Sequence, residues 1–132
     1  MRVLVGEDDP RTVRTIIEVL ETRGCEVDLE PTAQGCIERA ERESFDIVFL
    51  DLSLPDVPTA ESDEVIRQLK MANPKLNIIA MTANTTRELE RRIRRQGILF
   101  YLTKPVVRAL LDDLLLHVMK WDRVRPAHEL GA

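Results

Sequence analysis

Two kinds of hydrophobic pattern alternate along the chain. Short runs of Val, Ile, Leu and Phe between polar residues indicate strands, and longer segments with apolar residues at i, i+3, i+4 and i+7 indicate helices. Asp9 before Pro10 is a predicted helix N-cap, and Gly24 is a predicted helix end. Strands are predicted at 2–5, 25–30, 45–50, 77–81 and 100–103, and helices at 10–23, 32–43, 62–72, 86–96 and 106–120.

The order of these elements defines the fold class. Strand and helix alternate, and the connections between strands are too long for hairpins, so the strands should be parallel with helices on both faces. For five strands we predict an α/β, doubly wound sheet of flavodoxin-like order 2-1-3-4-5. The domain is predicted over residues 1–120, and residues 121–132, which lose the helical pattern, are interpreted as a C-terminal tail or a linker stub.

Composition narrows the class of protein. The chain has 132 residues, of which 44% are hydrophobic, and this is the size of one domain. The net charge of −4 argues against a direct nucleic-acid partner. Cys25 and Cys36 lack metal-ligand spacing and are expected to be free, buried thiols. No segment resembles a secretory signal or a membrane span, so we expect a cytoplasmic protein with no membrane partner.

Polar side chains follow the predicted strands at their carboxyl ends, where open parallel sheets bind ligands. Crowded carboxylates raise one another's pKa unless cations balance them. A lysine balances one charge, and an all-oxygen site suits Mg²⁺ or Mn²⁺ better than zinc. The residues at the strand ends are Glu7 and Asp8, Asp51, Thr82 and Lys104.

This set of side chains suits phosphoryl transfer to an aspartate, a reaction that depends on positioning and charge neutralisation. Asp51 stands alone at its strand end and is the better nucleophile, whereas Glu7 and Asp8 better suit metal binding. The Lys104 ammonium and the Thr82 hydroxyl are available to contact phosphoryl oxygens.

Four motifs, VGEDDP, FLDLSLPD, MTAN and YLTKP, occur in this order at the ends of predicted strands. Together they resemble the receiver domain of bacterial response regulators, the chemotaxis-regulator-like family, over about residues 2–118. The resemblance implies that Asp51 accepts a phosphoryl group from a sensor histidine kinase or a phosphotransfer protein. It also implies a magnesium site formed by Asp8 directly, Glu7 through water, Asp51, and the backbone carbonyl of Ser53.

The same resemblance assigns further roles to residues of the last two strands. Thr82 would hydrogen-bond the phosphoryl group, Lys104 would pair with it, and Tyr101 would be the switch aromatic that moves inward. The Lys104–Pro105 peptide bond is expected to be cis. The protein is expected not to be an enzyme beyond assisting its own phosphotransfer and dephosphorylation.

The resemblance also implies an output surface that binds a downstream protein, formed by helix 86–96, strand 100–103 and helix 106–120. The first of these helices is rich in arginine, and Glu88–Arg92 and Glu90–Arg94 pairs would make it an ordinary solvated face. A basic face that selects an acidic partner is the alternative. The last helix carries an apolar stripe wider than one buried face needs, so it is a candidate for partner docking or homodimer formation.

The segment after Asp51 departs from the family pattern. VPTAESDE, residues 57–64, has no glycine and is a few residues longer than is usual before the next helix, so we predict an altered loop with Ser62 at a new helix start. This departure keeps open the alternative of a pseudo-receiver that binds partners without phosphorylation. A flavin-binding protein is disfavoured because the acidic GEDD would repel a phosphate, and an aspartyl hydrolase because Ser53 replaces the usual second acid.

Overall fold

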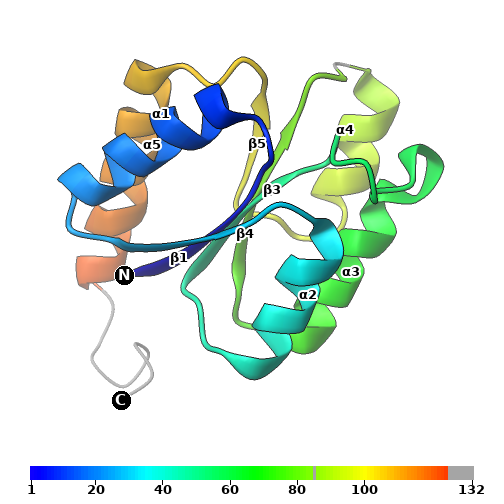
Figure 1. The fold of residues 1–132 in the computed structure, drawn as a ribbon, viewed down its shortest axis with the longest axis horizontal. Helices are drawn as coiled ribbons and strands as arrows, with labels where there is room; N and C mark the ends of the chain where they lie inside the picture. The colour runs from blue at the N-terminus through cyan, green and yellow to red at the C-terminus, as the bar shows by residue number, and fades with distance from the viewer. Residues whose placement is uncertain (85, 125–132) are drawn as a thin grey trace.

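The computed structural model describes residues 1–84 and 86–124, which form a parallel sheet covered on both faces by helices. The strand order is β2-β1-β3-β4-β5, as predicted. The strands are β1 (Arg2–Gly6), β2 (Glu26–Glu30), β3 (Ile47–Asp51), β4 (Asn77–Thr82) and β5 (Phe100–Thr103). Helices α1 (Pro10–Thr22) and α5 (Arg108–Val124) cover one face, and α2 (Ala33–Arg42), α3 (Ser62–Ala72) and α4 (Arg87–Arg94) cover the other (Figure 1).

The ends of the elements lie close to the predicted positions. Asp9 caps α1 by accepting a hydrogen bond from Arg11 N, and Gly24 follows the helix with φ of 78°. The last helix differs from the prediction, because it continues past residue 120 to Val124. Residues 125–132, the rest of the predicted tail, lie outside the described residues. None of the helices in the described ranges is long and apolar enough to cross a membrane.

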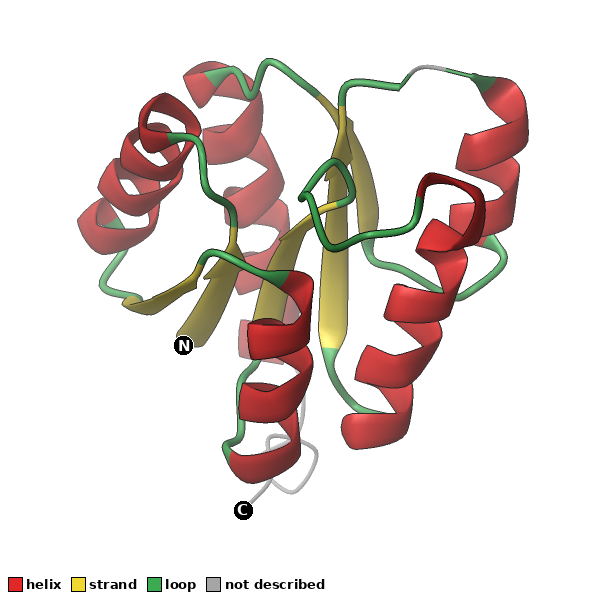
Figure 2. Ribbon diagram, turned by 45° about the vertical axis from the view of Figure 1, so that its right-hand side comes forward, coloured by secondary structure: helices red, strands yellow, loops and turns green. Residues whose placement is uncertain are grey.

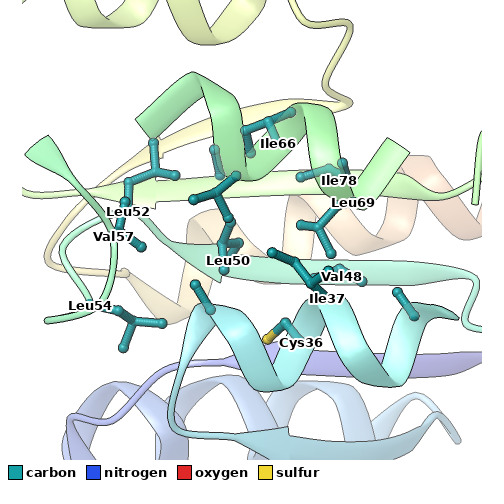
Figure 3. Close-up of a cluster of buried hydrophobic side chains, with 14 of the residues drawn as sticks. Cys36, Ile37, Val48, Leu50, Leu52, Leu54, Val57, Ile66, Leu69 and Ile78 are labelled. Carbon is teal, nitrogen blue, oxygen red and sulfur yellow. The ribbon is translucent and has the colours of Figure 1, made fainter. Parts of the chain in front are cut away.

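The core lies in two layers, one on each side of the sheet. Val48 and Leu50 of β3 pack toward α2 and α3 (Figure 3). Ile47 and Phe49 pack toward α1 and α5. All four are fully buried, so β3 is a central strand with no solvent-facing side. Gly6 is required where α2 crosses β1, since a Cβ atom there would lie 2.6 Å from the Sγ atom of Cys36.

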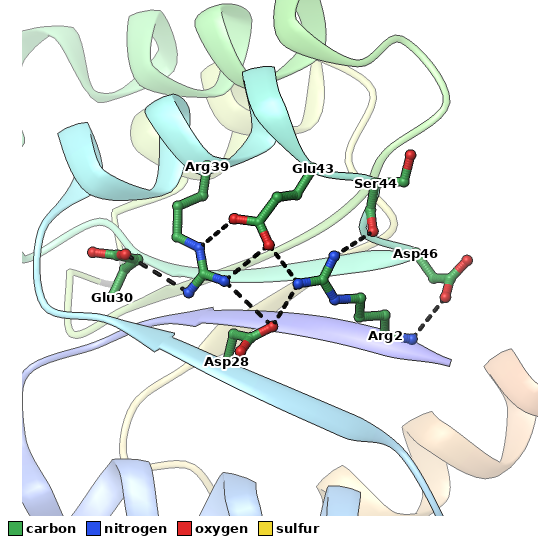
Figure 4. Close-up of polar contacts among 7 residues, drawn as sticks. All are labelled: Arg2, Asp28, Glu30, Arg39, Glu43, Ser44 and Asp46. Atoms are coloured by element: carbon green, nitrogen blue, oxygen red, sulfur yellow. Dashed lines mark hydrogen bonds and ion pairs between the residues drawn. The ribbon is translucent and has the colours of Figure 1, made fainter.

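A network of ion pairs joins β1, β2 and α2 (Figure 4). Arg2 pairs with Asp28 at 3.2 Å and with Glu43, and Arg39 pairs with Glu43 at 2.8 Å. Both guanidinium groups lie over the ring of Phe45, at 4.5 and 5.5 Å from its centroid. Hydrogen bonds from Arg39 and Arg2 lower the pKa of Glu43 to about 2, so the network stays charged at neutral pH.

Residues 52–61 connect β3 to α3 through a 3-10 turn at Thr59–Glu61 (Figure 2). As predicted, α3 begins at Ser62, but Ser62 does not cap it. With φ of −63° and ψ of −27°, Ser62 is already helical, whereas an N-cap residue is extended. Its hydroxyl is buried and has no hydrogen-bond partner among the described residues, while Asp63 and Glu64 occupy the favourable first turn.

Asp56, in the same connection, caps helix α2. Its carboxylate accepts hydrogen bonds from Ala33 N at 3.0 Å and Gln34 N at 2.9 Å, two groups that have no partner within the helix. The carboxylate also interacts favourably with the positive end of the helix dipole. The final residue of the motif FLDLSLPD therefore fixes the loop after β3 to a neighbouring helix.

We expect Asp56→Ala to lower the free energy of unfolding by about 1–2 kcal/mol, because the substitution removes a helix cap. Urea denaturation followed by circular dichroism measures this change. Glu61→Ala is the matched control, since Glu61 is exposed in the same connection and its side chain makes no capping bond. Equal losses in the two variants would show that the cap does not stabilise the protein.

Candidate functional site

Four charged side chains meet at the carboxyl ends of the strands, as the sequence predicts. Glu7 and Asp8 follow β1, Asp51 ends β3, and Lys104 follows β5. The Lys104 Nζ atom lies 2.6 Å from Glu7 Oε1 and 3.0 Å from Asp51 Oδ2. Each of the three acidic residues offers an oxygen, and these oxygens all lie within 4.8 Å of one another.

The sheet register explains why these residues meet. Gly6 pairs with Leu50, so the residues that follow them, Glu7 and Asp51, leave neighbouring strands at the same level. Asp51 is further held by Ser53, whose backbone N–H donates to Asp51 Oδ1 at 2.8 Å. The backbone N–H of Lys104 donates to the carbonyl oxygen of Thr82 at 2.8 Å. The cluster is therefore positioned by the ends of paired strands, which hold side chains more precisely than loops do.

The electrostatics of the cluster differ between its two buried acids. Burial, together with the nearby Asp51, raises the pKa of Glu7 to about 7 against the opposing effect of Lys104. Burial alone would raise the pKa of Asp51 as well, but hydrogen bonds with Glu7, Ser53 N and Lys104 outweigh it and lower this pKa. A proton bound by this pair of acids therefore resides on Glu7 rather than on Asp51.

Lys104 is held in its charged form by the same neighbours. Burial opposes the charge, but hydrogen bonds and charge interactions with Glu7 and Asp51 raise the pKa of Lys104. One ammonium group thus faces three carboxylates, and the cluster carries an excess of negative charge when all three are ionised.

The donor set fits a hard divalent cation. Its ligands are carboxylate oxygens, which Mg²⁺ and Mn²⁺ prefer. Glu7 and Asp51 are buried, whereas Asp8 is exposed and leaves the cluster open to solvent. Lys104 supplies one positive charge to these three carboxylates, and burial still raises the pKa of Glu7.

Thr82 and Tyr101 share Asn84 as a neighbour. Thr82 ends β4 and is buried, and its hydroxyl oxygen accepts a hydrogen bond from Asn84 N at 3.0 Å. The Tyr101 hydroxyl donates to the carbonyl oxygen of the same Asn84 at 3.3 Å. Both side chains therefore contact the connection between β4 and α4. The Lys104–Pro105 peptide bond is cis, as predicted.

Of the two ion pairs predicted on α4, one forms and the other does not. Glu90 and Arg94 pair at 2.8 Å. The prediction of a Glu88–Arg92 pair was wrong, because Arg92 pairs with Asp63 instead. The Arg92 guanidinium turns toward the start of α3. It donates to Asp63 of this helix at 3.2 Å and to the carbonyl oxygen of Ala60, in the preceding 3-10 turn, at 3.0 Å. A tertiary contact with two acceptors thus replaces the single local pair.

The apolar stripe on the last helix is wider than its buried face, as the sequence indicates. Leu111, Leu115 and Val118 are buried against the sheet and α1. Leu110 and Leu116 are each more than half exposed, at 54% and 51%. Val107, just before the helix, is also 54% exposed.

Comparisons with known proteins agree with this architecture. The sequence profile of the family described as "Response regulator receiver domain" matches residues 3–116. The sensor protein GacS of Pseudomonas syringae pv. syringae is 29% identical over 122 residues. That match covers 91% of this chain and 13% of GacS, so the chain spans only a small part of this relative's length.

Two solved structures share the fold. A CheY-like response regulator receiver domain from Methanospirillum hungatei is 26% identical with a TM-score of 0.78, and the match covers 92% of this chain and 96% of that one. The receiver domain of a sensor histidine kinase from Pseudomonas aeruginosa is 28% identical with a TM-score of 0.70, over 88% and 94% of the two chains. The latter structure holds a magnesium ion in its active site cleft.

Proposed function

The chain belongs to the response regulator receiver domain family, and on that premise we propose that it receives a phosphoryl group on Asp51. The donor would be a phosphohistidine of a sensor histidine kinase or a phosphotransfer protein, a class of partner that its similarity to GacS supports. The observation that carries the proposal is the Asp51 carboxylate, buried at the end of β3 with Lys104 Nζ 3.0 Å away. From its membership of this family, we also propose that the protein acts in the cytoplasm.

In the proposed reaction, a carboxylate oxygen of Asp51 attacks the phosphorus atom of the phosphohistidine. The phosphorus–nitrogen bond breaks, and its electron pair stays with the imidazole nitrogen of the donor. The lowered pKa of Asp51 keeps this carboxylate ionised and therefore nucleophilic at neutral pH. Lys104 stays protonated and would pair with a phosphoryl oxygen, and the Thr82 hydroxyl would donate to another.

Asp8, Glu7 through a water molecule, Asp51 and the backbone carbonyl of Ser53 would hold Mg²⁺ or Mn²⁺. The oxygen donor set supports this site, as does the magnesium ion in the similar receiver domain from Pseudomonas aeruginosa. When bound, the ion supplies positive charge that neutralises the phosphoryl oxygens. The chain would assist its own phosphotransfer and dephosphorylation without being an enzyme for a separate substrate.

Output would pass from Asp51 to the surface formed by α4, β5 and α5. Once Thr82 bonds the phosphoryl group, Tyr101 would move inward and change the connection between β4 and α4, which both residues contact through Asn84. A downstream protein would then bind this face. The exposed Leu110 and Leu116 offer apolar area for that contact or for a homodimer.

Incubation with acetyl phosphate and Mg²⁺ tests the phosphoacceptor function. We expect intact-mass spectrometry to show an adduct of about 80 Da, the mass added by one phosphoryl group. The same incubation with EDTA should give little or no adduct, because the carboxylate cluster then lacks its cation. The absence of an adduct in magnesium, under conditions that label another receiver domain, would instead favour the pseudo-receiver.

A further inference from the structure

The solvent face of helix α4 carries a row of arginines. Leu89 and Ile93 fix the orientation of the helix, because both are buried against the sheet. Arg87, Arg91 and Arg95 are exposed and follow one another at i, i+4 and i+8. At about 1.5 Å per residue, the row runs for about 12 Å along the helix and its C-terminal cap.

These three guanidinium groups differ from the other two arginines of the same segment. Arg92 pairs with Asp63 of α3, and Arg94 pairs with Glu90 and lies over the ring of Tyr101. Among the side chains described, those of residues 1–84 and 86–120, none pairs with an arginine of the row. Their charges are therefore open to a partner.

The helix dipole explains only part of this row. Cations near the C-terminus of a helix interact favourably with its dipole, which accounts for Arg91 and Arg95. Arg87 is the first residue of α4, where the dipole disfavours a positive charge. The positive charge of Arg87 thus disfavours the helix that carries it, and this unfavourable position points to a role in binding.

We propose that this row, Arg87, Arg91 and Arg95, docks an acidic segment of a partner protein through Asp or Glu side chains. The planar guanidinium fork matches a carboxylate with two parallel hydrogen bonds, and three such groups on one helix face select a run of carboxylates. The inference rests on the proposed function only in assigning α4 to the output face. The charge contact itself does not require Asp51.

A nucleic acid fits the row less well. Phosphate-backbone binding depends on many simultaneous contacts, and three arginines supply few of them. The exposed Glu88 and partly buried Glu90 also adjoin the row, and the whole chain carries a net charge of −4, so a long polyanion would be repelled beyond the three contacts.

Fluorescence anisotropy with a labelled polyglutamate peptide of about six residues, long enough to span the row, tests the proposal. We expect the triple variant Arg87→Gln, Arg91→Gln, Arg95→Gln to bind this probe about tenfold more weakly than the unmodified protein, and binding to be lost at about 1 M salt. The matched control is Arg14→Gln, Arg42→Gln, Lys75→Gln. It removes three exposed positive charges from separate places and should retain most of the binding.

Equal weakening in both triple variants would overturn the proposal, because it would show a dependence on net charge alone. Absence of polyglutamate binding, or tighter binding of a single-stranded oligonucleotide of similar length, would overturn it too. Both variants should still form the acetyl phosphate adduct. An unmodified protein that binds polyglutamate through the row but forms no adduct would refute the phosphoacceptor function and leave the docking surface standing.

Discussion

Asp51→Asn is expected to abolish the acetyl phosphate adduct completely. The amide is neutral and its oxygen is a poor nucleophile, so no acyl phosphate can form at this position. The amide has nearly the shape of the carboxylate, and its oxygen can still accept the hydrogen bond from Ser53 N that Asp51 accepts at 2.8 Å. Loss of the adduct can therefore be assigned to chemistry once circular dichroism shows an intact fold.

Asp56→Asn is the control for this experiment, because it makes the same chemical change a few residues away. Asp56 is exposed, and its carboxylate accepts hydrogen bonds from Ala33 N and Gln34 N of α2 rather than from Lys104. We expect this variant to be labelled as fully as the unmodified protein. An adduct that persists in Asp51→Asn would move the phosphoryl group to another carboxylate and would refute the assignment of Asp51.

The strand ends could be predicted from the sequence because they depend on a regular geometry. In a parallel sheet all strands end at the same edge, so the order of five apolar runs was enough to bring Asp51, Glu7 and Lys104 together. Burial of β3 followed from its continuous apolar sequence in the same way. These predictions required no knowledge of individual side-chain conformations.

The contacts of the loops could not be predicted, because they depend on which of several partners a side chain reaches. Local spacing favoured Glu88 as the partner of Arg92, but the folded chain offers Asp63 and a backbone carbonyl on its other side. Asp56 lies 23 residues from the Ala33 amide that it caps, a distance that no local rule covers. Ser62 begins α3 as expected, yet the preceding 3-10 turn makes it helical and removes it from the capping position.

The sequence predicts that crowding raises the pKa of an acid in this cluster, but it does not predict which acid is affected. Crowded acids at one edge predict that some pKa is raised, but the choice between Glu7 and Asp51 depends on hydrogen bonds. Asp51 accepts from Ser53 N and Lys104, which stabilises its ionised form. Glu7 accepts a backbone hydrogen bond from Asp8 and is almost fully buried, and it is the acid whose pKa rises.

The stability of the metal-free protein is expected to fall as the pH rises from about 5 to about 8. The pKa of Glu7 is raised from 4.5 to about 7 in the folded protein, so the folded state binds this proton more tightly than the unfolded state does. The resulting stabilisation is complete below pH 4.5 and is lost as the pH rises through 7. Full loss would correspond to roughly 3 kcal/mol, since one pKa unit is about 1.4 kcal/mol.

Urea denaturation in EDTA, repeated across this pH range with Glu7→Gln, measures the effect. The amide stays neutral at every pH, so the variant should show a much smaller slope and should be the more stable protein at pH about 8. Glu43 and Asp51 have lowered pKa values and titrate below this range, which leaves Glu7 as the main shifted acid within it. Glu41→Gln, an exposed acid, is the control and should keep the slope of the unmodified protein.

Magnesium should reverse the loss of stability at high pH in the unmodified protein and do so less in Glu7→Gln. A cation that binds only the folded state stabilises it, and it competes with the proton on Glu7 for the same carboxylate cluster. The stabilisation by magnesium should therefore grow as the pH rises from about 6 to about 8. An effect of magnesium that does not change with pH, or one that is equal in the two proteins, would show that Glu7 is not part of the cation site.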